Sequence, residues 1–152
     1  MKNLKAFVGV ILLIIINTNI FAQEQRVLAP EPDRNKPKLF ADLPEKINVN
    51  KTDLETVFNS PAGSSSRVVG NTLFNGTVVS KSNINDGSAK TIIINLAQRQ
   101  GAHLILTQRM KDGKVSYFGR IISKNNSDAY EIREENGQYI LEKKNYYDIV
   151  SE

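Results

Sequence analysis

The side chains that could do chemistry in this sequence are two arginines and a set of aromatic residues in its second half. Arg109 and Arg120 fall on successive predicted strands, where a shared sheet face would let them hold an anion. The aromatic residues could form a platform for a sugar or a peptide: Tyr117, Phe118, Tyr130, Tyr139, Tyr146 and Tyr147. The alternative is that they serve as core and barrel-rim residues, with the arginine stems lying over Phe118. The residues predicted to bind are Arg109, Tyr117, Phe118, Arg120, Tyr130 and Tyr139.

The usual catalytic and metal-binding patterns are not found. His103 is the single histidine and there is no cysteine, so the common zinc sites lack ligands. A calcium-loop match around the Asn-Asp-Gly turn fails because one ligand position falls on Ile84. The serine run 64–66 lacks a nucleophile elbow, and the facing carboxylates Glu131 and Glu142 lie in a hairpin without a cleft. We therefore predict no catalytic residue, no metal and no cofactor, and a protein that is not an enzyme.

The first 22 residues have the layout of a secretory signal peptide. Lys2 and Lys5 precede the apolar run 6–16, and Ile20-Phe21-Ala22 is a plausible cleavage site. A membrane anchor is the alternative, but the run is shorter than the roughly 20 apolar residues that span a bilayer. Cleavage after Ala22 predicts a secreted or periplasmic bacterial protein with no membrane contact after processing.

The net charge argues against a nucleic-acid partner. The 152-residue chain carries +4, and removal of the two signal lysines lowers this to +2, with both signs mixed along the chain. Nucleic-acid-binding surfaces instead cluster lysine and arginine on one face. Residues 23–38 contain three prolines and few apolar residues, which predicts a disordered tether before a single β domain at 39–152.

The remaining pattern predicts one short helix followed by strands and turns. Leu54, Val57 and Phe58 share a helical face, and Thr52 with Glu55 has capping-box spacing. Six strands are expected at 72–84, 90–96, 102–110, 115–124, 128–134 and 138–144, with a bulge or bend at Asn75-Gly76 and a last apolar piece at 146–150.

The turn at Asp112-Gly113 fixes the pairing of its two strands. A two-residue loop places Gln108 opposite Tyr117, Thr107 opposite Phe118 and Ile105 opposite Arg120. In the last hairpin, the same reasoning pairs Ile132 with Leu141 and Glu134 with Tyr139, which puts Tyr130, Ile132, Tyr139 and Leu141 on one face.

The predicted fold is mainly β. We expect a six-stranded antiparallel up-and-down meander, curled into a small barrel or half-barrel, with one short N-terminal helix packed on it. A curved open sheet with the helix on one face is the alternative architecture. A barrel mouth would offer a cavity lined by residues such as Ile94, Ile105 and Phe118.

The C-terminal half carries three short features: Phe118-Gly119-Arg120-Ile121, the turn Ser127-Asp128-Ala129, and Gly137-x-Tyr139-x-Leu141. With them this half, roughly half of the chain, resembles an exported bacterial module similar to the N-terminal, pro-domain-like region that precedes some secreted zinc metallopeptidases. No peptidase and no HExxH motif follow in this sequence, so no catalytic residue is implied. The resemblance implies a free-standing pro-domain-like or inhibitor-like module that binds an exported protein such as a protease. A small-ligand carrier, or an envelope-associated structural protein using the barrel mouth, is the alternative.

Overall fold

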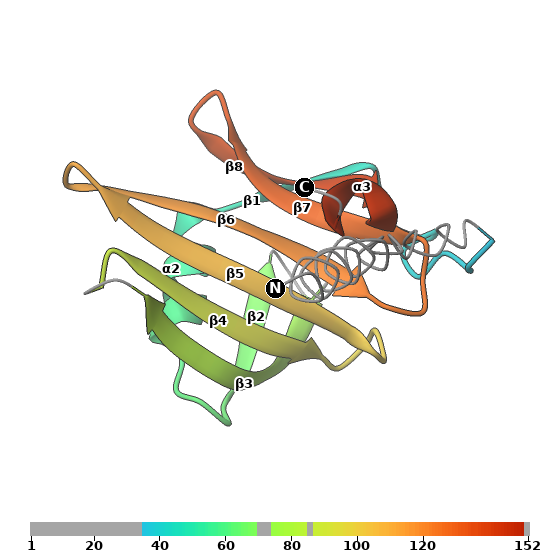
Figure 1. The fold of residues 1–152 in the computed structure, drawn as a ribbon, viewed down its shortest axis with the longest axis horizontal. Helices are drawn as coiled ribbons and strands as arrows, with labels where there is room; N and C mark the ends of the chain where they lie inside the picture. The colour runs from blue at the N-terminus through green and yellow to red at the C-terminus, as the bar shows by residue number, and fades with distance from the viewer. Residues whose placement is uncertain (1–34, 70–73, 85–86, 151–152) are drawn as a thin grey trace, which may run out of the picture. The chain divides into compact units, whose positions relative to one another are not determined.

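The computed structural model describes residues 35–69, 74–84 and 87–150, which form one antiparallel sheet and two short helices (Figure 1). The elements in chain order are β1 Lys46–Val49, α2 Lys51–Asn59, β2 Ser65–Val69, β3 Phe74–Ile84, β4 Ala89–Leu96, β5 Ala102–Lys111, β6 Lys114–Ser123, β7 Asp128–Glu135, β8 Gln138–Asn145 and α3 Tyr146–Val150. The predicted signal peptide and residues 23–34 of the predicted tether lie outside the described residues. No helix in the described ranges is long and apolar enough to cross a bilayer.

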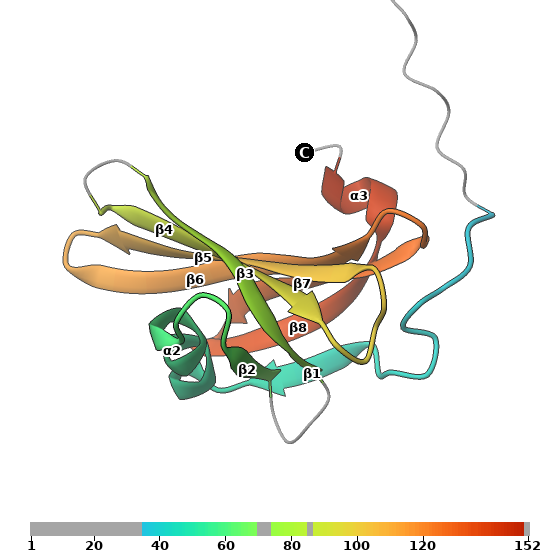
Figure 2. The ribbon, with the colours of Figure 1, turned by 90° about the horizontal axis from the view of Figure 1, so that it is seen from below.

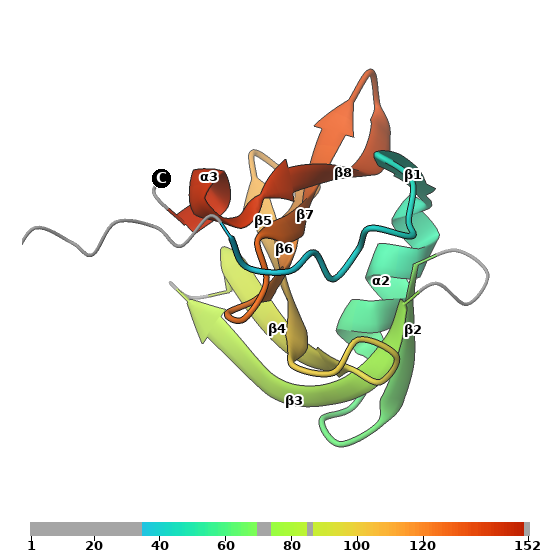
Figure 3. The ribbon, with the colours of Figure 1, turned by 90° about the vertical axis from the view of Figure 1, so that its right-hand side faces the viewer.

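The sheet is a meander that runs from β2 at one edge to β8, and β1 then pairs with the outer side of β8. β1 and β2 are therefore the two edge strands, and α2 connects them in the sequence. The sheet curls so that both edges turn toward the same side, where α2 lies (Figures 2 and 3). The architecture is an eight-stranded antiparallel half-barrel.

The six predicted strands are present, and two more strands extend the sheet. β1 lies in an apolar segment for which no strand was predicted, and its four residues alternate between exposed and buried. β2 begins inside the serine run 64–66, before the first of the six predicted strands. Pairing with β8 and β3 overrides the weak local preference of these short segments. The predicted last apolar piece is the helix α3.

The helix α2 forms where its apolar spacing predicted, and it buries Leu54 and Val57. The predicted Thr52–Glu55 capping box is wrong, because the helix begins at Lys51 with Asn50 as the N-cap. Thr52 therefore lies inside the first turn, and its carbonyl accepts a hydrogen bond from the Thr56 hydroxyl.

The irregularity predicted near Asn75-Gly76 is found in the pairing of β2 with β3, where the register shifts between Arg67 and Val69, opposite Asn75 and Phe74. The register of β3 against β4 shifts farther along the strand, between Val78 and Ser80. A Cβ on Gly76 would lie only 2.1 Å from the Asn95 carbonyl oxygen, so this glycine permits close approach of two strands.

The predicted register of both hairpins is confirmed. Gln108 pairs with Tyr117, Thr107 with Phe118 and Ile105 with Arg120. One register row carries the core across the sheet through residues that pair in sequence from strand to strand: Ile92, Leu106, Gly119, Ile132, Leu141 and Ile47. Apart from Gly119, which has no side chain, the residues of this row belong to the core cluster on the concave side of the half-barrel, together with the buried face of α2.

One end of the concave face is covered by residues 36–44, which we call the strap. Phe40 is fully buried, and its ring packs edge-on against Tyr130 and Phe74, with centroids 5.3 and 6.2 Å away. The Asp128 carboxylate accepts the backbone N–H groups of Leu39 and Phe40 at 2.6 and 2.9 Å. Further side chains bind strap carbonyls: Arg99 to Leu39, Lys143 to Leu43 and Tyr130 to Pro44. The strap thus completes the core.

Candidate functional site

The six residues predicted to bind separate onto the two faces of the sheet. Tyr117, Tyr130 and Tyr139 lie on the concave face with exposures of 3%, 0% and 5%, so they belong to the core. Arg109, Phe118 and Arg120 lie on the convex face. Strand alternation places neighbouring positions 117 and 118 on opposite faces, so the structure brings only Arg109, Phe118 and Arg120 of the six together on one surface.

The three buried tyrosines have structural hydrogen bonds. The Tyr117 hydroxyl accepts from the Gln108 amide at 2.9 Å, and the Tyr139 hydroxyl accepts the Tyr117 backbone N–H at 3.2 Å. Burial raises the pKa of Tyr117 and of Tyr139. Burial, with smaller contributions from neighbouring carboxylates, raises the pKa of Tyr130 to about 12. All three hydroxyls therefore stay protonated at neutral pH.

On the convex face, Phe118 is a large apolar side chain that remains 41% exposed. The guanidinium of Arg109 lies 5.1 Å from the centre of its ring, within cation–π distance. The sequence suggested that the aliphatic stem of an arginine lies over Phe118. In the structure, the charged end of Arg109 contacts the ring. An arginine stacked on an exposed aromatic ring is a composition enriched in the cores of protein interfaces.

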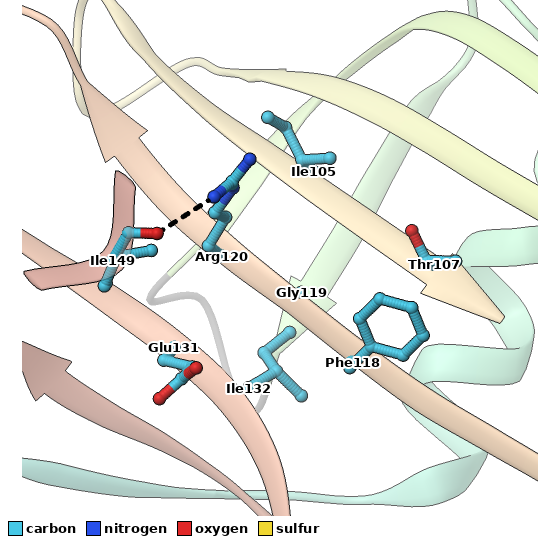
Figure 4. A pocket seen from close by; sticks show the side chains of 8 residues that line it. All are labelled: Ile105, Thr107, Phe118, Gly119, Arg120, Glu131, Ile132 and Ile149. Carbon is cyan, nitrogen blue, oxygen red and sulfur yellow. Dashed lines mark hydrogen bonds between the residues drawn. The ribbon is translucent and has the colours of Figure 1, made fainter. Parts of the chain in front are cut away.

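A pocket of about 300 Å³ opens on the convex face beside Phe118 (Figure 4). It is lined by residues from three strands and α3: Ile105, Thr107, Phe118, Gly119, Arg120, Glu131, Ile132 and Ile149. Phe118 and Thr107 lie at one end, and Arg120, Glu131 and Ile149 lie toward the other. The pocket therefore offers an apolar lining with one cation and one anion at the same end. We call these residues together with Arg109 the convex patch.

Arg120 connects the sheet to α3 at this pocket. Its guanidinium donates a hydrogen bond to the Ile149 carbonyl at 3.2 Å, and Ile149 is itself buried. The contribution of α3 to the site could not be read from the sequence, where residues 146–150 indicated only a short apolar piece. The one local signal is the i, i+3 spacing of Tyr146 and Ile149.

The convex face carries cations without ion pairs on one hairpin and a neutralised network on the next. Within the described residues, Arg109, Lys111 and Lys114 of the β5–β6 hairpin form no ion pair. On the β7–β8 hairpin, Glu142 contacts three cations: Lys144 at 2.7 Å, Arg133 at 3.0 Å and Lys46 at 3.9 Å. The close contact with the Lys144 ammonium is the main cause of the lowered pKa of Glu142. The uncompensated positive charge therefore lies beside Phe118.

The cavity predicted at the barrel mouth is not formed by the residues named for it. Ile94 is fully buried on the concave face, whereas Ile105 and Phe118 line the convex pocket. His103 lies near neither, and its Nδ1 is 2.6 Å from the Asn95 side-chain oxygen. Across the part of the chain that the structure describes, no group of three histidine, cysteine or acidic residues is placed to hold a metal ion.

The chain was compared with protein-family models, with curated proteins and with solved structures. No match was found in any of the three comparisons. The resemblance to metallopeptidase N-terminal regions thus stays a prediction. What the arrangement can do is inferred from its chemistry, which is apolar contact, aromatic–cation stacking and ion pairing.

Proposed function

We propose that this chain is an exported, non-enzymatic β domain that binds another protein through the convex patch. The observation that carries the proposal is the exposed Phe118 ring under Arg109 at the mouth of an apolar pocket, outside the core. Export rests on the signal layout of residues 1–22. The resemblance noted above favours an exported partner such as a protease.

The exposed area of Phe118 is large enough to matter for binding. A phenylalanine side chain presents about 200 Å², of which 41% is still exposed. At about 25 cal/mol per Å², burial of that remainder is worth about 2 kcal/mol. This is the size of an interface hot spot, and Arg109 and the pocket would add to it.

The size of the pocket favours a protein side chain over a free small molecule. Ligand pockets usually measure about 300–1,000 Å³, and this one is at the lower limit with about 300 Å³. A side chain of a partner needs less volume, since the partner's remaining surface packs on the surrounding sheet. We therefore favour protein binding over a carrier function.

Site-specific photo-cross-linking tests the proposal. A photoreactive phenylalanine analogue would replace Phe118 in one experiment and Met110 in another, in the cells that produce the protein. Met110 is the matched control, because it is 55% exposed on the same hairpin but on the opposite face of the sheet. We expect a discrete protein adduct from position 118 and none from position 110. Equal labelling at both positions, or no adduct at 118, contradicts the proposal.

A further inference from the structure

The β5–β6 and β7–β8 hairpins are neighbours in the sheet, and only a short length of β6 and β7 joins them. Within the described residues, β6 and β7 pair at three positions: Gly119 with Ile132, Arg120 with Glu131, and Ile121 with Tyr130. By contrast, β5 and β6 pair along their whole length. Toward their turns, the β5–β6 and β7–β8 hairpins point in different directions (Figure 1). Residues 114–118 of β6 are therefore paired on one side only.

The geometry of the turn decides which backbone groups face this open side. Lys111 and Lys114 flank a two-residue loop and form its hydrogen-bonded closing pair. Even-numbered residues of β6 then bond to β5, and Val115 and Tyr117 direct their N–H and C=O groups away from it. Consistent with this, the Tyr117 N–H donates to the Tyr139 hydroxyl at 3.2 Å. A side-chain oxygen occupies the position that a carbonyl of a neighbouring strand would otherwise take.

The convex patch lies at the closed end of this fork. Its pocket is lined by Gly119 and Ile132, the last pair before the two strands separate. Lys111 and Lys114 lie at the open end, and Arg109 covers Phe118 between them. A segment entering the fork would pass unpaired positive charge and end at an apolar pocket.

We infer that the free edge of β6, residues 114–118, accepts an extended acidic segment of the partner protein as an added strand, with one apolar side chain of that segment in the convex pocket. The inference rests on the proposed protein-binding function and names the chemistry of the partner. Backbone pairing with Val115 and Tyr117 supplies affinity, and the pocket selects the side chain. The three cations select carboxylates, and the Tyr139 hydroxyl yields its bond to a carbonyl of the added strand.

The part of β3 that does not pair with β2 is a second open strand edge, and its residues differ from those of β6. Beyond Val78, where its register shifts, β3 presents a run of exposed polar residues, Ser80–Asn83, that includes Lys81. Lysine, polar residues and a bulge are the features that protect a strand edge from pairing. Residues 115 and 117 of β6 are instead valine and tyrosine, with no bulge in their pairing to β5.

A peptide titration followed by amide hydrogen exchange tests the inference on the purified protein. The probe is a capped hexapeptide of alternating valine and aspartate. The controls are its N-methylated form, which cannot pair, and a valine–lysine version. With the valine–aspartate probe, but with neither control peptide, we expect amide exchange at Val115 to slow about five-fold, the equivalent of one hydrogen bond. Absence of protection up to roughly 1 mM probe, or equal protection by either control, overturns the inference.

Two substitutions give opposite expected effects on probe affinity. Val115→Pro removes an N–H from the free edge without removing a bond to β5, and it should abolish binding, whereas Val115→Thr retains the N–H and should bind. Tyr139→Phe removes the hydroxyl that competes for the Tyr117 N–H, so it should bind the probe about five-fold more tightly. Unchanged affinity in both Val115→Pro and Tyr139→Phe overturns strand addition.

The failure of this inference can be told apart from failure of the proposed function. Cross-linking from position 118 that persists in Val115→Pro would leave protein binding intact and refute strand addition. A third outcome is that the unsubstituted protein forms a concentration-dependent dimer and Val115→Pro does not. The occupant of the β6 edge would then be a second copy of this chain, which also overturns the acidic partner.

Discussion

Removal of the Asp128 carboxylate should release the strap from the end of the half-barrel. Asp128 is 4% exposed and accepts two backbone N–H groups, from Leu39 and Phe40. Hydrogen bonds to charged groups contribute about 1.5–3 kcal/mol each. Since the Phe40 N–H is also buried, we expect Asp128→Ala to lower the free energy of unfolding by about 3 kcal/mol. The matched control Asp148→Ala, at an exposed aspartate of α3, should change it by less than about 0.5 kcal/mol.

The strap also predicts a non-additive double substitution. Phe40→Ala removes a fully buried ring from contact with Phe74 and Tyr130, which should lower the unfolding free energy by about 4 kcal/mol. Asp128→Ala frees the same segment, so the combined loss should fall at least about 1 kcal/mol short of the sum.

Urea titrations of the unsubstituted protein and the four variants give these free energies, and amide exchange at Leu39 and Phe40 reports the release directly. A loss below about 1 kcal/mol for Asp128→Ala, or full additivity with Phe40→Ala, would refute the proposed closure by the strap.

Three further predictions follow from single contacts. The Tyr130 pKa of about 12 in the folded protein lies above the ordinary value of 10.0, so the tyrosine loses its proton first in the unfolded state. The free energy of unfolding should therefore fall by about 2–3 kcal/mol between pH 10 and 12, and urea titrations of Tyr130→Phe over this range should lack that decrease. Gly119→Ala should lower the unfolding free energy by about 2–3 kcal/mol, because its Cβ would lie 2.5 Å from the Ile105 carbonyl oxygen, and an unchanged urea midpoint would contradict that contact. Phe118→Ser should lower the unfolding free energy by about 1–3 kcal/mol, because the covered part of the ring and its contact with Arg109 are lost, and an unchanged urea midpoint would contradict that packing.

The hairpins could be predicted from the sequence because their turns fix the strand register. Asp112-Gly113 determines which residues share a face, and a one-residue slip would invert every side chain. The pairs Gln108–Tyr117 and Ile132–Leu141 were therefore predictable one residue at a time. The two edge strands were not predictable, since four or five residues carry little local preference and gain their structure from pairing.

The candidate site was only partly predictable, for a related reason. The sequence pattern predicted Arg109, Phe118 and Arg120 as binding residues. It also predicted three tyrosines whose side chains are buried on the concave face: Tyr117, Tyr130 and Tyr139. Strand alternation within one hairpin can be read locally, whereas the fork between β6 and β7 depends on where two hairpins stop pairing. The position of α3 over Arg120 likewise follows from tertiary packing.

The affinity of the protein captured at position 118 tests the central claim most directly. That partner would be titrated against the unsubstituted protein, Phe118→Ser and Met110→Ser, each confirmed to be folded under the conditions of the titration. A hot spot worth about 2 kcal/mol predicts binding roughly 30-fold weaker for Phe118→Ser. For Met110→Ser, on the opposite face of the same hairpin, we expect unchanged affinity. Equal affinities for Phe118→Ser and the unsubstituted protein would contradict binding through the convex patch.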